Sequence, residues 1–130
     1  MRMSLSDLKL LPLLAMTPSM IRSAEKRSPR LRKLLHEEEF TMEIATRSGV
    51  GGHFVLHNGQ FDFHWGRHAK PDFAQTWRSG DDAVRTLTTR DETAMLRGYE
   101  SGLYTMQGRF TVGLWFNEVM KLARNPDAVS

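Results

Sequence analysis

An Asn-Gly pair at positions 58 and 59 stands between two runs of alternating apolar and polar residues. This arrangement predicts a β-hairpin with a two-residue turn, because Asn and Gly both tolerate the positive φ angles that such a turn requires. A two-residue turn also determines which residues face each other, and it places His53 directly opposite His64. The hairpin therefore limits the fold of the chain more than any other local pattern does.

The predicted register gives the hairpin two unlike faces, because side chains alternate along a strand. One face carries Phe54, Leu56, Phe61, Phe63 and Trp65. The opposite face carries His53, Val55, His57, Gln60, Asp62 and His64. The aromatic face needs either a covering layer of the protein or an apolar ligand.

Further strands are indicated by the same period of two. Residues 40–45 alternate ahead of the hairpin and join it through the glycine-rich turn 48–52, so three antiparallel strands in meander order are expected. Apolar and polar residues alternate more weakly over residues 71–77, and this pattern predicts a fourth strand. Residues 103–110 predict a fifth strand that Gly108 interrupts or ends.

Helices are expected before and after these strands. The leucines between positions 5 and 14 suggest an opening helix that Pro12 bends. Thr17-Pro18 and Ser28-Pro29 each pair an N-cap residue with a proline at the first helical position, which predicts two helix restarts. The second restart carries a leucine stripe.

Three more helices are expected in the second half of the chain. Asp81 is predicted to cap a short helix that runs through Leu87. The tetrad 89–92 matches a capping box that opens a helix ended by Gly102. A terminal helix is predicted up to Pro126 by an apolar stripe with helical spacing; the stripe consists of Val112, Trp115, Phe116, Val119, Met120 and Ala123.

These elements predict an α+β protein with a five-stranded, antiparallel-rich sheet and helices packed on one face. A length of 130 residues with 40% hydrophobic and 25% charged residues is that of one ordinary globular domain. The absence of cysteine excludes disulfides, thiolate nucleophiles and cysteine-based zinc sites, and it suits a reducing cytoplasm. No apolar run approaches the roughly 20 residues that a membrane span requires.

The positive charge is concentrated at the N-terminus. Residues 1–35 hold eight Lys or Arg and two Asp or Glu, a balance of +6, whereas the rest of the chain holds ten basic and thirteen acidic residues. We therefore expect residues 1–35 to form a basic helical arm ahead of a domain at 36–130. Such an arm can approach an anionic membrane or a partner enzyme. The alternative is a solvated helix face balanced by the three glutamates at 37–39.

The histidines raise the question of a metal site. His53 and His64 are expected roughly 5 Å apart at Cβ, and Asp62 lies diagonal to both. His57 lies about 13 Å along the strand from His53, so it cannot join them. A metal-assisted enzyme using His53, Asp62 and His64 is one alternative, but ordinary polar-face histidines are favoured. Because no catalytic motif is present, we predict no catalytic residue, no metal and no cofactor.

Three segments together give the chain a resemblance to the sterol carrier protein-2 (SCP-2) family. They are the HNGQF hairpin, the KPDFAQTWRSGDDAVRTL passage from strand to helix, and the ending GLYTMQGRFTVGLWFNEVMKL. The resemblance covers about residues 36 to 124 and places Gly108 at the glycine of the family's final strand. It departs from the family's usual I-x-G-D ending, because Arg109 stands at the acidic position.

The resemblance implies a non-enzymatic protein that carries a lipid or other hydrophobic ligand between the sheet and the C-terminal helices. Bacterial relatives include accessory proteins of quinone synthesis, which implies a polyprenyl-type ligand. The residues that we expect to contact the ligand are Phe54, Leu56, Phe61, Phe63, Trp65, Trp77, Met106, Trp115, Phe116, Val119 and Met120. Eight methionines also suit a cavity for varied apolar guests.

A second hypothesis is an interaction module that binds a lipid or quinone biosynthetic enzyme or forms a homodimer. The expected location is the cytoplasm, including the peripheral surface of the membrane. Nucleic acid is the weakest candidate partner, because the basic run lacks the interleaved aromatic residues that stack on bases.

Overall fold

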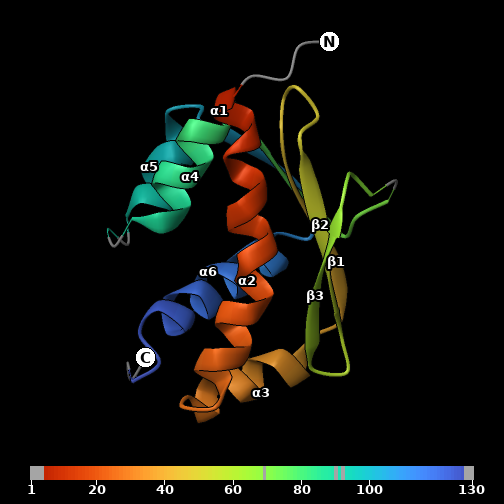
Figure 1. Cartoon of the computed structure of the whole chain (residues 1–130), viewed down its shortest axis with the longest axis vertical. Coiled ribbons are helices and arrows are strands. Elements are labelled where there is room, and N and C mark those ends of the chain that lie inside the picture. The colour runs from red at the N-terminus through yellow and green to blue at the C-terminus, as the bar shows by residue number, and fades with distance from the viewer. Residues whose placement is uncertain (1–4, 69, 90, 92, 128–130) are drawn as a thin grey trace.

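The protein folds as a twisted five-stranded sheet with helices on one side (Figure 1). The computed structural model describes residues 5–68, 70–89, 91 and 93–127. The strands are β1 (Phe40–Thr46), β2 (Gly51–His57), β3 (Gln60–Trp65), β4 (Phe73–Trp77) and β5 (Tyr104–Gly108). The helices are α1 (Leu5–Leu8), α2 (Leu10–Glu25), α3 (Pro29–Glu37), α4 (Gly80–Thr88), α5 (Ala94–Glu100) and α6 (Phe110–Arg124).

The predicted hairpin is confirmed in its register as well as its position. Asn58 and Gly59 have φ angles of 51° and 79°, and β2 pairs with β3 so that His53 faces His64. The sheet order is β3-β2-β1-β4-β5, with antiparallel pairs throughout except for the parallel pair of β1 and β4. The expected antiparallel-rich α+β sheet is therefore confirmed, including its fourth and fifth strands.

Helix α2 is one continuous helix, so the predicted restart at Thr17-Pro18 is wrong. Pro18 lies inside the helix, and the Thr17 hydroxyl donates to the carbonyl oxygen of Leu13 at 2.8 Å. Loss of one backbone hydrogen bond at a proline is outweighed by the buried stripe that α2 presents to the core. The interruption falls instead at Lys9, between α1 and α2, where the backbone keeps helical dihedral angles. Pro12 has no N–H to donate to the carbonyl oxygen of Leu8, so one helical hydrogen bond is missing there.

The N-terminal helices belong to the core. Leu10, Leu14, Ile21, Leu31 and Leu35 are each at most 1% exposed and belong to one hydrophobic cluster with the inner side chains of the sheet. In Figure 1, α2 runs lengthwise beside the sheet, and α4 and α6 also contact the sheet, at β4. Helices α2 and α3 therefore share one hydrophobic core with the sheet.

Helix ends follow local chemistry, with one correction. Ser28 caps α3 as predicted, since its hydroxyl accepts from the backbone N–H of Leu31 at 3.1 Å. Helix α4 is capped by Ser79, not by Asp81, because Ser79 has the extended backbone of a cap and accepts from the N–H of Asp82. The predicted capping box at 89–92 includes two residues outside the described part of the chain.

The last elements end as expected. Gly102, with φ of 83°, follows α5, and Gly108, with φ of 100°, closes β5 before α6 begins. Helix α6 stops at Arg124, two residues ahead of Pro126. Among the described residues, no helix combines the length and the apolar character needed to cross a membrane.

Candidate functional site

An aromatic cluster lies between the inner face of the sheet and α6. Phe54 stacks on Phe61 with ring centroids 4.7 Å apart, and both rings approach Phe116 at 6.1 and 6.5 Å. Trp115 meets Phe61 at 5.6 Å and donates its indole N–H to the carbonyl oxygen of Leu34 in α3. The sheet, α3 and α6 therefore meet at these rings.

The eleven predicted ligand-contact residues fall into three groups. Those buried in the core are Phe54, Leu56, Phe61, Trp77, Trp115, Phe116, Val119 and Met120. Phe63 and Met106 are half-buried. Trp65 lies on the same face of the sheet as Phe63 but is 64% exposed, because β3 is an edge strand and Trp65 lies at its end. Their role in binding a ligand remains a prediction.

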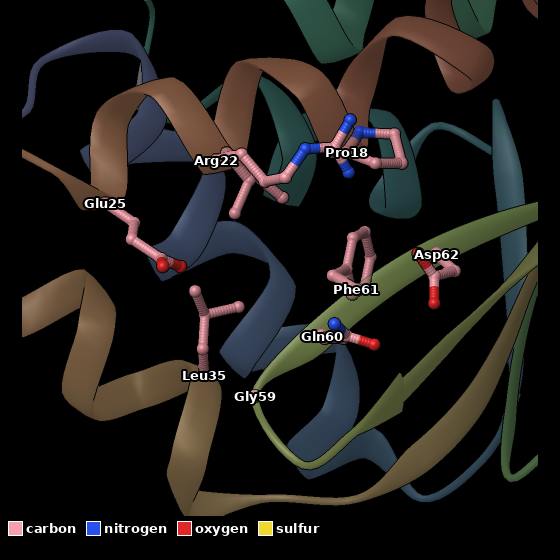
Figure 2. A pocket seen from close by; sticks show the side chains of 9 residues that line it. Pro18, Arg22, Glu25, Leu35, Gly59, Gln60, Phe61 and Asp62 are labelled. Atoms are coloured by element: carbon pink, nitrogen blue, oxygen red, sulfur yellow. The ribbon is translucent and has the colours of Figure 1, made fainter.

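A pocket of about 190 Å³ lies between α2, α3 and the start of β3 (Figure 2), and not between the sheet and the C-terminal helices as the sequence predicts. Its lining residues are Pro18, Ile21, Arg22, Glu25, Leu35, Gly59, Gln60, Phe61 and Asp62. Of the eleven predicted residues, Phe61 alone lines it. Phe61 also links this pocket to the aromatic cluster, because its ring contacts Phe54 and Trp115.

The pocket combines an apolar floor with a charged rim. Ile21, Leu35 and Phe61 are at most 4% exposed and supply the floor. Arg22 and Glu25 line the pocket from α2; the Arg22 side chain runs along this helix toward Pro18, and Glu25 extends toward Leu35 (Figure 2). Within the described residues, Arg22 forms no ion pair, so its guanidinium is available to a guest.

Sequence reasoning missed the pocket residues that come from α2 and α3. A pattern that could have revealed them is the spacing of Leu10, Leu14, Ile21 and Ala24, which forms one helical stripe through both prolines. That stripe identifies α2 as a core helix, and it places Arg22 beside the stripe. The helix restart inferred at Thr17-Pro18 hid this continuity.

A second, shallower hollow of about 380 Å³ borders the same hairpin turn and is lined by His36, Glu37, Glu38, Glu39, Asn58 and Gly59. Its three carboxylates already have partners. Glu37 pairs with Lys33, Glu38 with Arg109, and Glu39 with His57. These partners account for the acidic cluster without a ligand.

The outer face of the sheet carries a polar cluster centred on Glu43, which is 2% exposed. Its carboxylate accepts from Nε of Arg67 at 3.2 Å and from the backbone N–H of His68 at 2.9 Å. His53 lies opposite Glu43 in the sheet register. The centroid of its ring is 5.1 Å from the ring centroid of His64 and also 5.1 Å from that of His68. The segment after β3 thus covers this part of the outer face.

The predicted neighbourhood of His53 and His64 is confirmed, but the proposed metal ligands do not converge. The two rings stack with planes 20° apart, and Nδ1 of His53 is 3.0 Å from the carbonyl oxygen of Gly66. Over the described part of the chain, no three His, Asp or Glu side chains are arranged to hold a metal ion. The geometry gives no support to a metal-assisted enzyme.

Comparison with solved structures shows which fold this is. The UbiJ-SCP2 ubiquinone synthesis protein is similar with a TM-score of 0.68 and 19% identity, over 98% of this chain and 100% of that one. The sterol carrier protein domain 2 of Helicoverpa armigera is similar with a TM-score of 0.61 and 16% identity, covering 100% and 98%. Palmitated SCP2L2 from Aedes aegypti is similar with a TM-score of 0.55 and 16% identity, over 91% of this chain and 95% of that one.

The chain therefore has the sterol carrier protein-2 fold, with its mixed five-stranded sheet and helices. No family model matches the sequence, and no curated protein matches it either. The predicted fold resemblance is confirmed, and it extends through the N-terminal helices, since the similarity to the UbiJ-SCP2 protein covers 98% of the chain.

Proposed function

We propose that this protein binds a lipid or other hydrophobic ligand and does so without covalent chemistry. The observation that carries the proposal is the aromatic cluster under the sheet, which connects through Phe61 to a pocket that opens between α2 and β3. The fold is also that of proteins named as sterol carriers, one of them palmitated. A fold alone does not define a function, so the pocket is the main support.

The binding mechanism would be physical. An apolar chain gains about 25 cal/mol for each Å² removed from water, and burial inside a protein provides that gain. The core side chains around Phe61 and Phe116 are closely packed, so a long guest requires these rings to separate. Methionines contribute to this adaptability, because Met120 of α6, Met20 of α2 and Met106 of β5 are flexible side chains in or beside the core.

The basic end of the molecule would bring the protein to its ligand. The exposed cations here are Arg22, Lys26, Arg27, Arg30, Arg32 and Lys33, at the end of α2 and along α3. Three of them form ion pairs, with Asp127, Glu118 and Glu37. Of the other three, Arg22 lines the pocket and Arg32 donates to the carbonyl oxygen of the lining residue Glu25. This position suits approach to an anionic membrane surface or an acidic partner.

Extraction of natively purified protein tests the proposal. We expect mass spectrometry of an organic-solvent extract to find one lipid class in near-stoichiometric amount. Val119→Leu, which adds volume to the closed interior, should reduce the extracted lipid, whereas Val84→Leu on α4 serves as the matched control. An empty extract together with no uptake of fluorescent lipid from vesicles would contradict the proposal.

An accessory role in quinone synthesis is the second candidate, and it is favoured by the similarity to the UbiJ-SCP2 ubiquinone synthesis protein. In this role the protein would present its ligand to a biosynthetic enzyme or act as a homodimer. Light scattering combined with co-purification tests it. A protein that stays monomeric and brings down no biosynthetic enzyme at working concentration would rule this role out.

A further inference from the structure

Strand β3 is an edge strand, and half of its backbone groups point away from the sheet. Hydrogen-bonded pairs alternate along antiparallel strands, and in a two-residue hairpin they begin at the residues that flank the turn, here His57 and Gln60. The N–H of Gly66 donates to the carbonyl oxygen of Gly51 at 3.1 Å, which fits the same alternation. The even-numbered residues of β3 therefore bond to β2. The odd-numbered residues, at 61, 63 and 65, direct their N–H and C=O groups to the open edge.

Strand β3 lacks the features that usually protect an edge strand. Such strands commonly carry proline, lysine or a bulge. The pairing of β3 with β2 runs from residue 60 to 65 without a bulge, and the strand holds neither proline nor lysine. Among the described residues, the backbone hydrogen bonds of turns, loops and caps use no N–H or C=O group of Phe61, Phe63 or Trp65. This edge is therefore open to pairing with another strand.

The exposure of the side chains shows where a second strand has access. Asp62 and His64 are exposed on the outer face, Trp65 is 64% exposed and Phe63 is half-buried. Phe61 is 4% exposed, because the start of β3 lies beside α2. The accessible stretch of the edge is therefore residues 62–65, and a large aromatic side chain stands without cover at its end.

Two copies of this stretch are complementary in one antiparallel register. A two-fold axis at Phe63 opposes that residue to its own counterpart and places Asp62 of each copy opposite His64 of the other, on the outer face. Moving the axis by one residue instead opposes Asp62 to Asp62, or His64 to His64. Like charges directly opposite each other are destabilising, whereas unlike partners stabilise a strand pair. The register centred on Phe63 is therefore favoured.

The two polar side chains of this register are free to pair between copies. Within the described residues, neither Asp62 nor His64 forms an ion pair. The His64 ring stacks on His53, a contact that uses the face of the ring and not its nitrogens. A carboxylate accepts hydrogen bonds, and an imidazole donates at least one N–H in either protonation state. Two such pairs would form in a two-fold dimer.

We propose that the open edge of β3 binds a second copy of this chain, so that the two sheets join antiparallel with Phe63 on the two-fold axis. Trp65 of each copy then lies toward Phe61 of the other, beside the pocket that Phe61 lines. One strand pair is smaller than the roughly 1,200 Å² at which stable interfaces begin, so we expect a dissociation constant on the order of 100 µM. In dilute solution the monomer predominates, and Trp65 stays exposed. The inference is independent of ligand binding, and it gives a surface to the homodimer of the second candidate function.

Single cysteines test the register, because the chain has no cysteine of its own. Phe63→Cys places two thiols at the axis, where the Cα atoms of a hydrogen-bonded pair lie about 5.5 Å apart, within disulfide range. We expect this variant to form a covalent dimer under mild oxidation. Asp62→Cys and His64→Cys should cross-link at least about fivefold more slowly, because their counterparts are diagonal neighbours about 7–8 Å away. Glu100→Cys, exposed on α5, measures random collision.

Exchange of the paired side chains tests the interface in a chain that keeps its aromatic residues. Sedimentation of the full chain between about 10 µM and 1 mM measures association. Asp62→His or His64→Asp alone opposes like side chains twice, and each should weaken association about five- to tenfold. The double exchange restores both unlike pairs and should return the dissociation constant to within about twofold. Gln107→Asp on β5, at the opposite edge, is the matched control and should change nothing. Circular dichroism verifies that each variant is folded.

Several results would overturn the inference. They are a chain that stays monomeric at about 1 mM, cross-linking of Asp62→Cys or His64→Cys as readily as of Phe63→Cys, and a double exchange that associates no better than the single variants. Binding of a different protein at β3 without self-association would also overturn it. The outcome is separable from ligand carriage. A dimer with an empty lipid extract supports the interface and contradicts carriage, whereas lipid extracted from a monomeric chain does the reverse.

Discussion

The two faces of the sheet bury their side chains in different ways. On the inner face, Phe54 and Leu56 lie under α2 and α6 and are at most 1% exposed. On the outer face, Glu43 is equally enclosed, but its cover is the short segment that follows β3, and its partners are Arg67 and the backbone of His68. Alternation along β1 and β2 therefore assigns each side chain to a face, but the cover determines whether it is buried.

The comparison also separates two kinds of stabilisation. Burial on the inner face is apolar and depends on close packing. The free energy of unfolding lost on substitution there should therefore scale with the side-chain volume removed. Burial on the outer face depends on hydrogen bonds to a carboxylate. The free energy of unfolding lost on substitution there should therefore scale with the number of polar groups left without a hydrogen-bond partner. Within the described chain, every buried side-chain nitrogen or oxygen has a hydrogen-bond partner. Substitutions on each face should reveal these different dependences.

The largest effect is expected for Phe54→Ala, which removes a fully buried ring from the aromatic cluster. It should lower the free energy of unfolding by about 3–5 kcal/mol, because a cavity remains where the ring packed. Val55→Ala, the next residue on the same strand but half-buried on the outer face, should cost about 1 kcal/mol. Urea denaturation measures both. Equal losses would mean that the two faces are packed alike.

Removing the outer-face carboxylate should have the next largest effect. Glu43→Gln weakens the contacts with Arg67 and the His68 N–H, and we expect a loss of about 1–3 kcal/mol. The control Glu39→Gln alters a carboxylate that is 59% exposed and paired with His57, and it should cost less than about 0.5 kcal/mol. A neutral Glu43→Gln would show that the polar cover adds nothing to stability.

Two helical glycines test how closely the helices pack. A Cβ on Gly113 of α6 would lie 2.8 Å from the Phe73 ring, so Gly113→Ala should destabilise by about 1–2 kcal/mol. A Cβ on Gly98 of α5 would meet nothing closer than 3.5 Å, so Gly98→Ala should stabilise by about 0.5–1 kcal/mol. Thermal unfolding of the two variants should move in opposite directions. Movement in the same direction would contradict the close approach of α6 to the sheet.

The smallest effect is expected for Trp65→Ala. Trp65 belongs to the inner face of the sheet but is 64% exposed. Its main partner is Phe63, and the two ring centroids are 5.0 Å apart. The loss should stay below about 1 kcal/mol. Iodide quenching of Trp65, in a chain with the other two tryptophans replaced by Phe, should be efficient. Protection from iodide would show that this end of β3 is covered in solution.

Local patterns were sufficient for the hairpin, the strand faces and most helix ends. Turn geometry involves only neighbouring residues, so Asn58-Gly59 determined the pairing of β2 with β3 without reference to the rest of the chain. The Ser28 cap and the glycines at 102 and 108 acted over equally short distances. The parallel pairing of β1 with β4, by contrast, left no mark in the local pattern.

The course of α2 and the position of the pocket depended on contacts between segments far apart in the chain. Local chemistry at Thr17-Pro18 indicates a helix start, yet the helix continues through it, because burial of Leu14 and Ile21 against the sheet outweighs one absent hydrogen bond. The same packing brings Arg22 beside Phe61 and forms the pocket. Burial in the tertiary structure is cooperative and depends on distant segments, whereas helix propensity depends only on neighbouring residues. At α2, tertiary burial has the stronger effect.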